Sequence, residues 1–387
     1  MFFFNKNDKY SAKTLFILKN PQWRLTRNKV TSIFSSRKFK NMIPLIVNAS
    51  DQLINKIKTI SLCNDSIDVR DLCLKYGIDV ISLCGFRFEA KAQENSQFQS
   101  AARNLLGETL LRNIATSSYF YSPFLVKLFG FNFFDRKSAE FLEKVLLNII
   151  QNRKVSKQLH GDMTDMLIQM IENPHFDLNG GISLALNLII AGFETTGNVL
   201  SYILYELCLN QSIQDRLGEE IFHTTTQKHE SISLHAILEM KYLEMVVKEG
   251  LRKYPPLPFL DRVCTNNYTI PGTDVVIEKG TPVFISIWAL HHDQNNFKNP
   301  EIFDPDRFSS ANKSNIISCT YMPFGEGHRN CIGTNLGILA ISIALIQILK
   351  HFKLELRDTS LKLNTKSTSF LLVPSDNVLY LKFKPIA

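Results

Sequence analysis

The chain has 387 residues, of which 45% are hydrophobic and 21% are charged, which excludes disordered and fibrous proteins and allows a large buried core. Its 44 Lys and Arg residues against 36 Asp and Glu residues give a net charge of +8, spread along the chain, which suits an acidic partner but does not indicate nucleic acid. Seven cysteines without CxxC pairs argue against a disulfide framework or a zinc site and favour a reducing compartment.

The first four residues, Met1–Phe4, are too few for a membrane anchor or a signal sequence, since Asn5 and Lys6 follow at once. From about residue 12 to residue 255 the apolar residues mostly recur at helical spacing. The clearest segments are Met42–Ile57, Val69–Ser82, Phe141–Ile150, Asp165–Ile171 and Ile182–Leu209. A further helix over Lys241–Arg252 is expected to end before two prolines, because proline cannot continue a helix.

Beyond residue 255 the pattern changes to short strands and turns. Strands are predicted at Tyr268–Ile270, Val275–Ile277 and Val283–Ile285, and a long apolar helix after Cys331. The stretch from Cys331 to Leu349 carries no charged residue and contains about fourteen apolar residues, which predicts a buried core helix rather than a membrane span. A terminal hairpin is expected from Phe370–Val373 and Val378–Leu381. No repeat or linker divides the chain, so we expect one mainly helical domain, residues 1–387, with small sheets.

The segment from Phe324 to Gly333, with the sequence FGEGHRNCIG, carries the strongest chemical signal. Its glycines allow the backbone to approach a ligand, the helix that follows offers N–H groups, and Arg329 adds positive charge, so Cys331 is expected to favour the thiolate. An axial thiolate on a loop is the ligand of a haem iron. A free buried cysteine is the alternative, whereas a phosphate-binding loop fails because Asn330 stands where its third glycine would be.

A second signal, Ala191–Gly197 with the sequence AGFETTG, lies inside a long helical run. Two glycines there argue for a ligand pressed against the backbone. The Thr195 hydroxyl can bond to a preceding carbonyl and open the helix locally, and Glu194 next to it completes an acid–alcohol pair suited to proton transfer. Read alone, the segment is also compatible with a tolerated helix defect.

The chain resembles the cytochrome P450 family in several motifs, taken in the same order along the chain. The cysteine loop fits the family's F-x-x-G-x-R-x-C-x-G signature, and the helical segment fits A-G-x-E-T-T. The sequence also contains counterparts of the family's W-x-x-x-R helix, E-x-x-R helix and P-E-R-F segment. The resemblance implies the mainly α cytochrome P450 fold and is closest to microsomal animal enzymes that oxidise hydrophobic and foreign compounds.

The resemblance also implies roles for individual residues. Cys331 would be the axial ligand of the haem iron, and Thr195 with Glu194 would handle protons. The remaining haem contacts would be Trp23, Arg27, Arg262, Phe324, Arg329 and Gly333, four of which (Trp23 and the arginines) would hold the propionates. A buried network that supports the loop would consist of Glu249, Arg252 and Arg307. Apolar substrate contacts would be Phe193, Pro258, Phe259, Leu260 and Phe370.

Two of these motifs also allow a simpler interpretation, and one further segment allows a metal site. Trp23 and Arg27 lie one helical turn apart, which also describes an ordinary amphipathic surface helix. Glu249 and Arg252 at i,i+3 also describe a surface ion pair. At His291-His292-Asp293, where the family often has H-x-D, a metal site is the alternative.

The implied activity is that of a haem-thiolate monooxygenase with haem b. Electrons would come from NADPH through NADPH–cytochrome P450 reductase, with cytochrome b5 as a further donor, and the substrate would be a hydrophobic small molecule. The family resides on the cytosolic face of the endoplasmic reticulum. Roughly a hundred residues of the family pattern, including the anchor and the first strands and helices, have no counterpart before Trp23, so a soluble cytosolic product is the alternative.

Two other functions remain open at this point. One is an inactive truncated family member that binds haem poorly or not at all. The other is a haem enzyme that rearranges peroxides or dehydrates, against which the Glu194-Thr195 pair argues. A further departure is Asn335, where relatives tend to carry arginine on the surface that docks the reductase.

Overall fold

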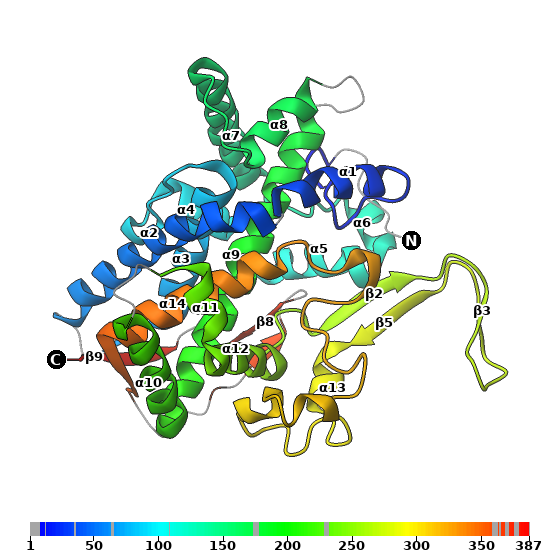
Figure 1. Ribbon diagram of the computed structural model, residues 1–387. Helices are drawn as coiled ribbons and strands as arrows, with labels where there is room; N and C mark the ends of the chain where they lie inside the picture. Colours follow the sequence, from blue (N-terminus) through cyan, green and yellow to red (C-terminus); the bar gives the residue numbers. More distant parts are fainter. Residues whose placement is uncertain are drawn as a thin grey trace.

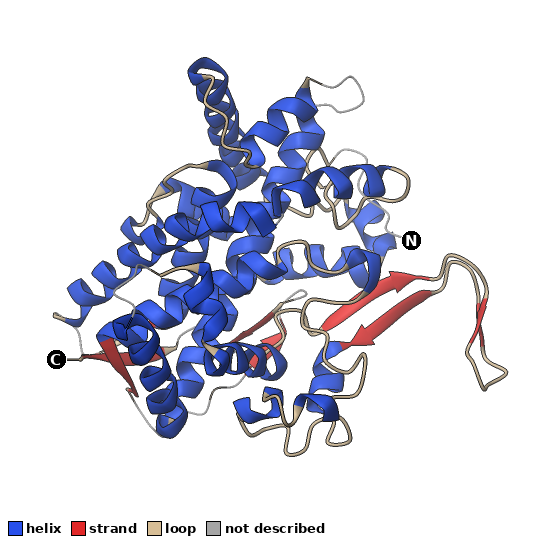
Figure 2. Cartoon of the chain, in the orientation of Figure 1, coloured by secondary structure: helices blue, strands red, loops and turns tan. Residues whose placement is uncertain are grey.

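The structure, a computed structural model, describes residues 8–386 apart from residues 12, 35, 63–65, 108, 173–177, 228–231, 358–362, 364, 368–370 and 375–378. Helices make up most of it, and the strands form small sheets, as the sequence predicts (Figures 1 and 2). The sheets are spread across the view, from β9 at the left edge to β3 at the right edge (Figure 1). The α-helices are α1 (Gln22–Thr31), α2 (Ser36–Ser61), α3 (Val69–Phe86), α4 (Gln97–Asn104), α5 (Leu110–Tyr121), α6 (Pro123–Phe129), α7 (Arg136–Ser156), α8 (Met163–Ile171), α9 (Leu178–Leu209), α10 (Gln211–Gln227), α11 (Leu234–Glu239), α12 (Lys241–Lys253), α13 (Ile287–His292) and α14 (Thr334–His351).

The predicted helices are confirmed, with small shifts at their ends. Several begin at an aspartate whose carboxylate accepts a backbone N–H of the first turn, as Asp68 does for α3, Asp135 for α7 and Asp162 for α8. α12 ends at Lys253, one residue beyond the predicted end and just before Pro255.

Within the described residues, the strands form four antiparallel sheets. They are β1 (Ile67–Asp68), β2 (Phe259–Val263), β3 (Tyr268–Thr269), β4 (Val276–Ile277), β5 (Pro282–Ser286), β6 (Phe352–Leu356), β7 (Thr365–Ser367), β8 (Leu372–Pro374) and β9 (Tyr380–Pro385). The pairs are β2–β5, β3–β4 and β7–β8, and the fourth sheet has the order β1–β9–β6.

The expected terminal hairpin is wrong. β8 pairs with β7, and β9 pairs with β1 and β6, so the two strands enter different sheets. Alternating apolar residues predict that a segment is a strand, but the pattern carries no information about which strand lies beside it. Phe370, at the start of the predicted hairpin, lies outside the described residues.

The centre of the core is the contact between α3 and α9, and glycines bring the two helices close. A Cβ on Gly197 of α9 would lie 2.8 Å from the Leu74 Cα, and one on Gly77 of α3 would lie 2.6 Å from the Phe193 carbonyl oxygen. Gly192 faces Ile81 of α3 in the same way. The expectation that the α9 glycines admit a ligand is therefore wrong, because they admit a neighbouring helix.

Two of the described helices, α9 and α14, are long and apolar enough to cross a membrane by length and composition. Most of each is buried inside the protein, 78% of the most apolar window in α9 and 67% in α14. This burial is typical of the core helices of a globular fold, which is what the sequence predicts for α14.

Candidate functional site

The cysteine loop is a tight turn that ends at the N-terminus of α14. Gly325 and Gly327 have φ angles of +71° and +76°, which only glycine adopts without strain. The Cys331 N–H donates to the Phe324 carbonyl over 2.8 Å, and this bond closes the loop. Gly333 caps α14, and a Cβ on it would lie 3.9 Å from the Cys331 Sγ. The sequence thus places the thiol beside the first turn of the helix.

The protonation of Cys331 differs from the expectation of a favoured thiolate. The residue is exposed to solvent, yet burial among the surrounding protein atoms raises the pKa of its thiol. The two observations agree if the thiol faces an open hollow. Hydrogen bonds from Gly333 and Thr334 and the charge of Arg27 act in the opposite direction but do not outweigh burial. The neighbouring charge comes from Arg27, whereas the sequence pointed to Arg329.

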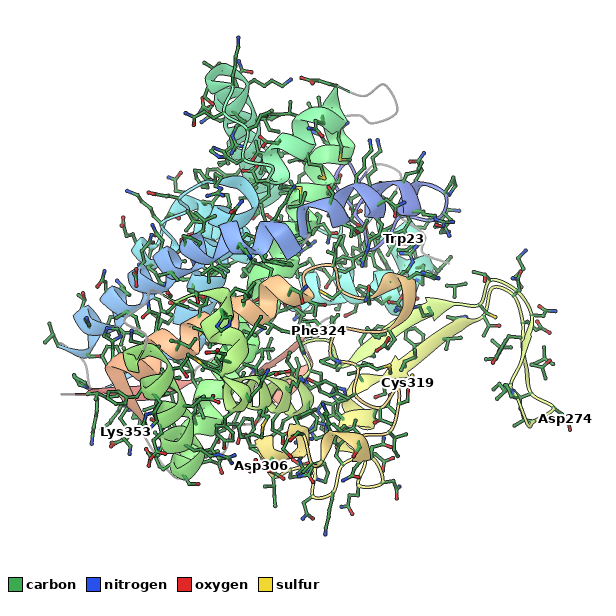
Figure 3. The ribbon with its side chains drawn as sticks, viewed as in Figure 1. Trp23, Asp274, Asp306, Cys319, Phe324 and Lys353 are labelled. Atoms are coloured by element: carbon green, nitrogen blue, oxygen red, sulfur yellow. The ribbon has the colours of Figure 1, made fainter. Side chains whose placement is uncertain are left out.

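Three guanidinium groups, which we call the arginine cluster, lie around this loop and belong to Arg27, Arg262 and Arg329. Arg27, on α1, donates to the Asn330 carbonyl over 2.8 Å and to its Oδ1 over 2.9 Å. Arg329 lies 4.3 Å from the ring centre of Trp23 and donates to the Leu18 carbonyl over 2.9 Å. Figure 3 shows Trp23 on the same side of the fold as Phe324, where the loop begins.

The positive charge of the cluster is only partly compensated, by the nearby carboxylate of Asp261. Burial lowers the pKa of Arg329, and the charges of Arg262 and Arg27 lower it further, while Asp261 acts against them. Burial likewise raises the pKa of the Asp261 carboxyl. In the described part of the chain, none of the three arginines has a carboxylate within salt-bridge distance. Arg329 is repelled by both of the other arginines, and an anionic ligand at this loop could relieve the repulsion.

Alternate side chains of β2 point to opposite faces of the strand, and one of these faces lies against the cysteine loop. Leu260 and Arg262 point toward the loop, because a Cβ on Gly325 would lie 3.4 Å from the Leu260 Cδ1 and 4.0 Å from the Arg262 guanidinium. Phe259 instead contacts aromatic rings, with ring centres 5.2 Å from Tyr121 of α5 and 6.0 Å from Phe284 of β5.

The partly exposed stretch of α9 runs from Ala191 to Thr195. The helix is buried on both sides of it, and within it Phe193 alone is buried. The Thr195 hydroxyl donates to the Ala191 carbonyl over 2.7 Å, the bond expected from the sequence, and α9 remains continuous through it. Thr196 packs near Gly337 of α14, so this stretch lies beside the start of the helix that follows Cys331.

The structure brings Glu249, Arg252 and Arg307 together in what we call the Glu249 network. Glu249 and Arg252 are fully buried and joined by two hydrogen bonds of 2.7 and 2.8 Å. Arg307 lies 3.4 Å from Glu249 and also donates to the Asn299 carbonyl over 2.8 Å. Burial raises the pKa of the Glu249 carboxyl, and the two arginines oppose this rise.

His291, which the sequence raised only as part of a metal site, joins this network. Its Nδ1 lies 3.0 Å from the Arg252 carbonyl oxygen, and its Nε2 lies 3.0 Å from the Met322 backbone nitrogen. The described residues contain no group of three or more His, Cys, Asp or Glu side chains suited to hold a metal ion. The sequence does place His291 in the segment between the Lys241–Lys253 helix and the cysteine loop, and this position could have suggested a contact with both.

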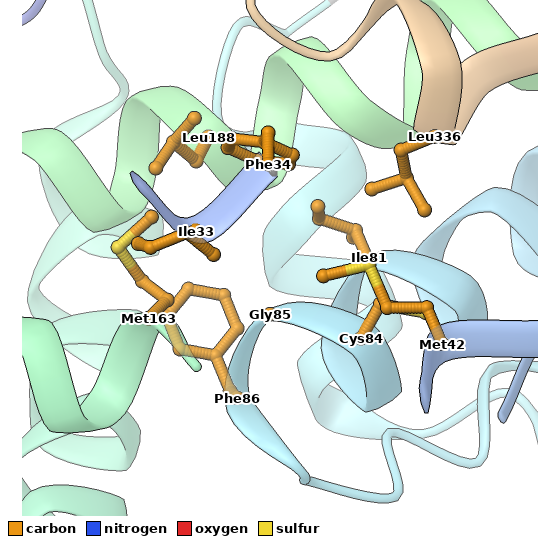
Figure 4. Close-up of a pocket in the computed structure, with 10 residues that line it drawn as sticks. All are labelled: Ile33, Phe34, Met42, Ile81, Cys84, Gly85, Phe86, Met163, Leu188 and Leu336. Carbon is orange, nitrogen blue, oxygen red and sulfur yellow. The ribbon is translucent and has the colours of Figure 1, made fainter. Parts of the chain in front are cut away.

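The predicted substrate contacts do not form one cluster. Leu260 touches the cysteine loop, Phe259 faces α5, Pro258 is half-buried, and Phe193 is fully buried in the core. A small apolar pocket lies elsewhere, between side chains of α2, α3, α8, α9, the turn after α1 and the start of α14 (Figure 4). None of the predicted substrate contacts that the structure describes lines it.

Comparison with known proteins places almost the whole chain in one group. The model of the family described as Cytochrome P450 matches residues 1–381. The chain is 36% identical to Cytochrome P450 6k1 of Blattella germanica over 96% of this chain and 76% of that protein. It is 35% identical to Cytochrome P450 6l1 of the same organism, over 97% and 73%, and 31% identical to the Probable cytochrome P450 6a13 of Drosophila melanogaster, over 97% and 77%.

Proposed function

Because the chain belongs to the cytochrome P450 family and is therefore a monooxygenase with a haem-iron cofactor, we propose that Cys331 is the ligand of that iron. The residues present fit the group. Cys331 faces solvent beside the N-terminus of α14, and the arginine cluster surrounds the same loop. Haem b would satisfy both features, because its iron accepts a thiolate ligand and its two propionate carboxylates can pair with the arginines.

The haem, when bound, supplies the activation of molecular oxygen, from which one atom is transferred to the substrate. The arginine cluster would hold the two propionates, and the guanidinium charges that now repel one another would each gain an anionic partner. The indole of Trp23, only 8% exposed and covered by Arg329, would add an N–H donor. Iron coordination would hold Cys331 as the thiolate, against the rise in pKa that burial causes.

Thr195 and Glu194 are proposed to move protons. The Thr195 hydroxyl is partly exposed and now bonded to the Ala191 carbonyl, so it can turn from that carbonyl toward the site and donate its proton. The adjacent Glu194 carboxyl, also partly exposed, would return the proton to the hydroxyl.

The substrate is proposed to be a hydrophobic small molecule of the foreign-compound type that contacts Leu260, the predicted pocket residue nearest the loop. Electrons would come from NADPH through cytochrome P450 reductase, with cytochrome b5 as a second donor, at the face that carries the exposed Asn335. The proposed location is the cytosolic face of the endoplasmic reticulum.

The experiment is the difference spectrum of the expressed chain, reduced and exposed to carbon monoxide. The wild type should give the red-shifted Soret band of a thiolate ligand, and Cys331→Ser should abolish it. Cys319→Ser, which removes another exposed cysteine, is the matched control and should leave the band unchanged. A thiolate-type band that survives in Cys331→Ser would refute the assignment. Product formation that requires both NADPH and the reductase would test the electron source.

A further inference from the structure

His291 is fully buried in the last turn of α13, and both of its ring nitrogens have backbone partners. The Arg252 carbonyl can only accept, so Nδ1 must carry the proton; the Met322 N–H can only donate, so Nε2 must be free of one. The arrangement therefore needs one neutral tautomer. Burial lowers the pKa of His291 to about 4, which keeps the ring neutral at physiological pH.

One of these partners belongs to the Glu249 network. The Arg252 guanidinium donates to the His291 carbonyl over 2.9 Å while the His291 ring donates to the Arg252 carbonyl, so the two residues are bonded in both directions. Arg252 is in turn bonded to Glu249. His291 cannot move relative to this buried group without breaking several hydrogen bonds.

The other partner is the beginning of the cysteine loop. The Met322 carbonyl accepts the Gly325 N–H over 3.0 Å, and the next turn closes with the bond from Cys331 to Phe324. Tyr321 stacks on the His291 ring with ring centres 5.5 Å apart, and its hydroxyl donates to the Lys248 carbonyl of α12. The ring thus lies between α12 and the residue from which the loop departs.

We infer that His291 is a positioning residue that ties the start of the cysteine loop to the Glu249 network and thereby sets the place of Cys331. The inference rests on the proposed function, because its main readout is the state of the iron ligand. Two substitutions separate the two bonds. The amide nitrogen of asparagine superposes on Nδ1 and keeps the bond to Arg252, whereas the amide oxygen of glutamine reaches the place of Nε2 and keeps the bond from Met322.

The test compares wild type, His291→Asn, His291→Gln and the control His292→Asn in the carbon monoxide difference spectrum. Among the described residues, the His292 ring has its hydrogen-bond partner within its own helix, the Trp288 carbonyl, and it stacks on that indole. In His291→Asn the buried Met322 N–H loses its acceptor, so we expect the ratio of unshifted to red-shifted Soret band to rise about tenfold. His291→Gln keeps the bond from the Met322 N–H, and its backbone carbonyl still accepts from the Arg252 guanidinium, so the link to the network persists and this variant should resemble the wild type. His292→Asn should resemble the wild type as well.

A second readout needs no haem. Hydrogen exchange of the peptide that contains the Met322 amide should be faster in His291→Asn than in His291→Gln or the wild type. Equal exchange and equal band ratios in His291→Asn and the wild type would overturn the inference, and so would equal losses in His291→Asn and His291→Gln. If His291→Asn does not fold, a shifted ratio in His291→Gln overturns it and a wild-type ratio supports it. A wild type without the red-shifted band would refute the proposed function instead.

Discussion

The Glu249 network and the arginine cluster contact different parts of the same region, the network through His291 at Met322 and the cluster at Asn330. They differ in what surrounds their guanidinium groups. In the network, Arg252 is fully buried and bonded to a carboxylate and to backbone carbonyls. In the cluster, the hydrogen-bond partners of Arg27 and Arg329 among the described residues are neutral groups, and burial, followed by the charges of Arg262 and Arg27, lowers the pKa of Arg329. Arginines that are satisfied inside the protein stabilise the fold, whereas the cluster arginines, with only neutral partners, fit the proposed role of binding an anionic ligand.

The largest expected effect is on the network side. Arg252→Met keeps the length of the side chain but leaves the Glu249 carboxylate buried beside Arg307 alone. The free energy of unfolding should fall by about 3–5 kcal/mol, the usual loss when one partner of a buried ion pair is removed. Urea unfolding of the haem-free protein measures it. The matched control is Lys353→Ala, which removes an exposed pair with Asp215 and should cost less than about 1 kcal/mol. Equal losses of unfolding free energy in the two variants would show that the buried pair stabilises the fold no more than the exposed pair does.

The network should also respond to pH through His291. Its pKa is about 4 in the folded protein and 6.5 in the unfolded chain, so between these values the unfolded chain binds more protons and stability falls as the pH falls. At about 1.4 kcal/mol for each pKa unit, this group should account for a loss of about 3 kcal/mol from pH 6.5 to pH 4. Urea unfolding across this range should show a smaller loss in His291→Gln, which cannot titrate. Identical pH profiles would contradict the burial of a neutral ring.

In the arginine cluster, a substitution should leave the stability of the fold nearly unchanged and weaken the retention of haem. Arg262→Gln removes one of three like charges, so the unfolding free energy of the haem-free protein should stay within about 0.5 kcal/mol of the wild type. Haem retention should fall about 10- to 100-fold, because a charge-assisted hydrogen bond to a carboxylate is lost. The rate of haem transfer to an excess of a haem-free acceptor protein measures this. Arg24→Gln removes an exposed charge from the same helix as Arg27 and should change neither quantity.

Apolar periodicity and the proline stop predicted the helices well, because both depend on residues close together in the chain. The apolar spacing of Val69–Ser82 and Ile182–Leu209 corresponds to α3 and α9, and the prolines after Lys253 end α12. The positive φ angles of Gly325 and Gly327 follow from the same kind of local chemistry. Strand partners could not be predicted in this way, since β8 and β9 enter different sheets although they lie close together in sequence.

The candidate site divides in the same way. The sequence pointed to Cys331, Thr195 and the arginines through their spacing in motifs, but it attributed the glycines of α9 to a ligand and the charge near the thiol to Arg329. The structure shows that Gly192 and Gly197 face α3, and that Arg27, more than three hundred residues before Cys331, supplies the charge. Contacts between segments so far apart leave no periodic trace in the chain.

By itself, the sequence determined the helices, the turn that presents Cys331 and the family to which the chain belongs, because these depend on residues close together in the chain. Only the tertiary structure decided which groups each arginine contacts, that His291 joins α12 to the loop, and that burial raises the pKa of the Cys331 thiol. Hydrogen-bond partners and desolvation depend on every atom nearby, and most of those atoms belong to residues distant in the sequence.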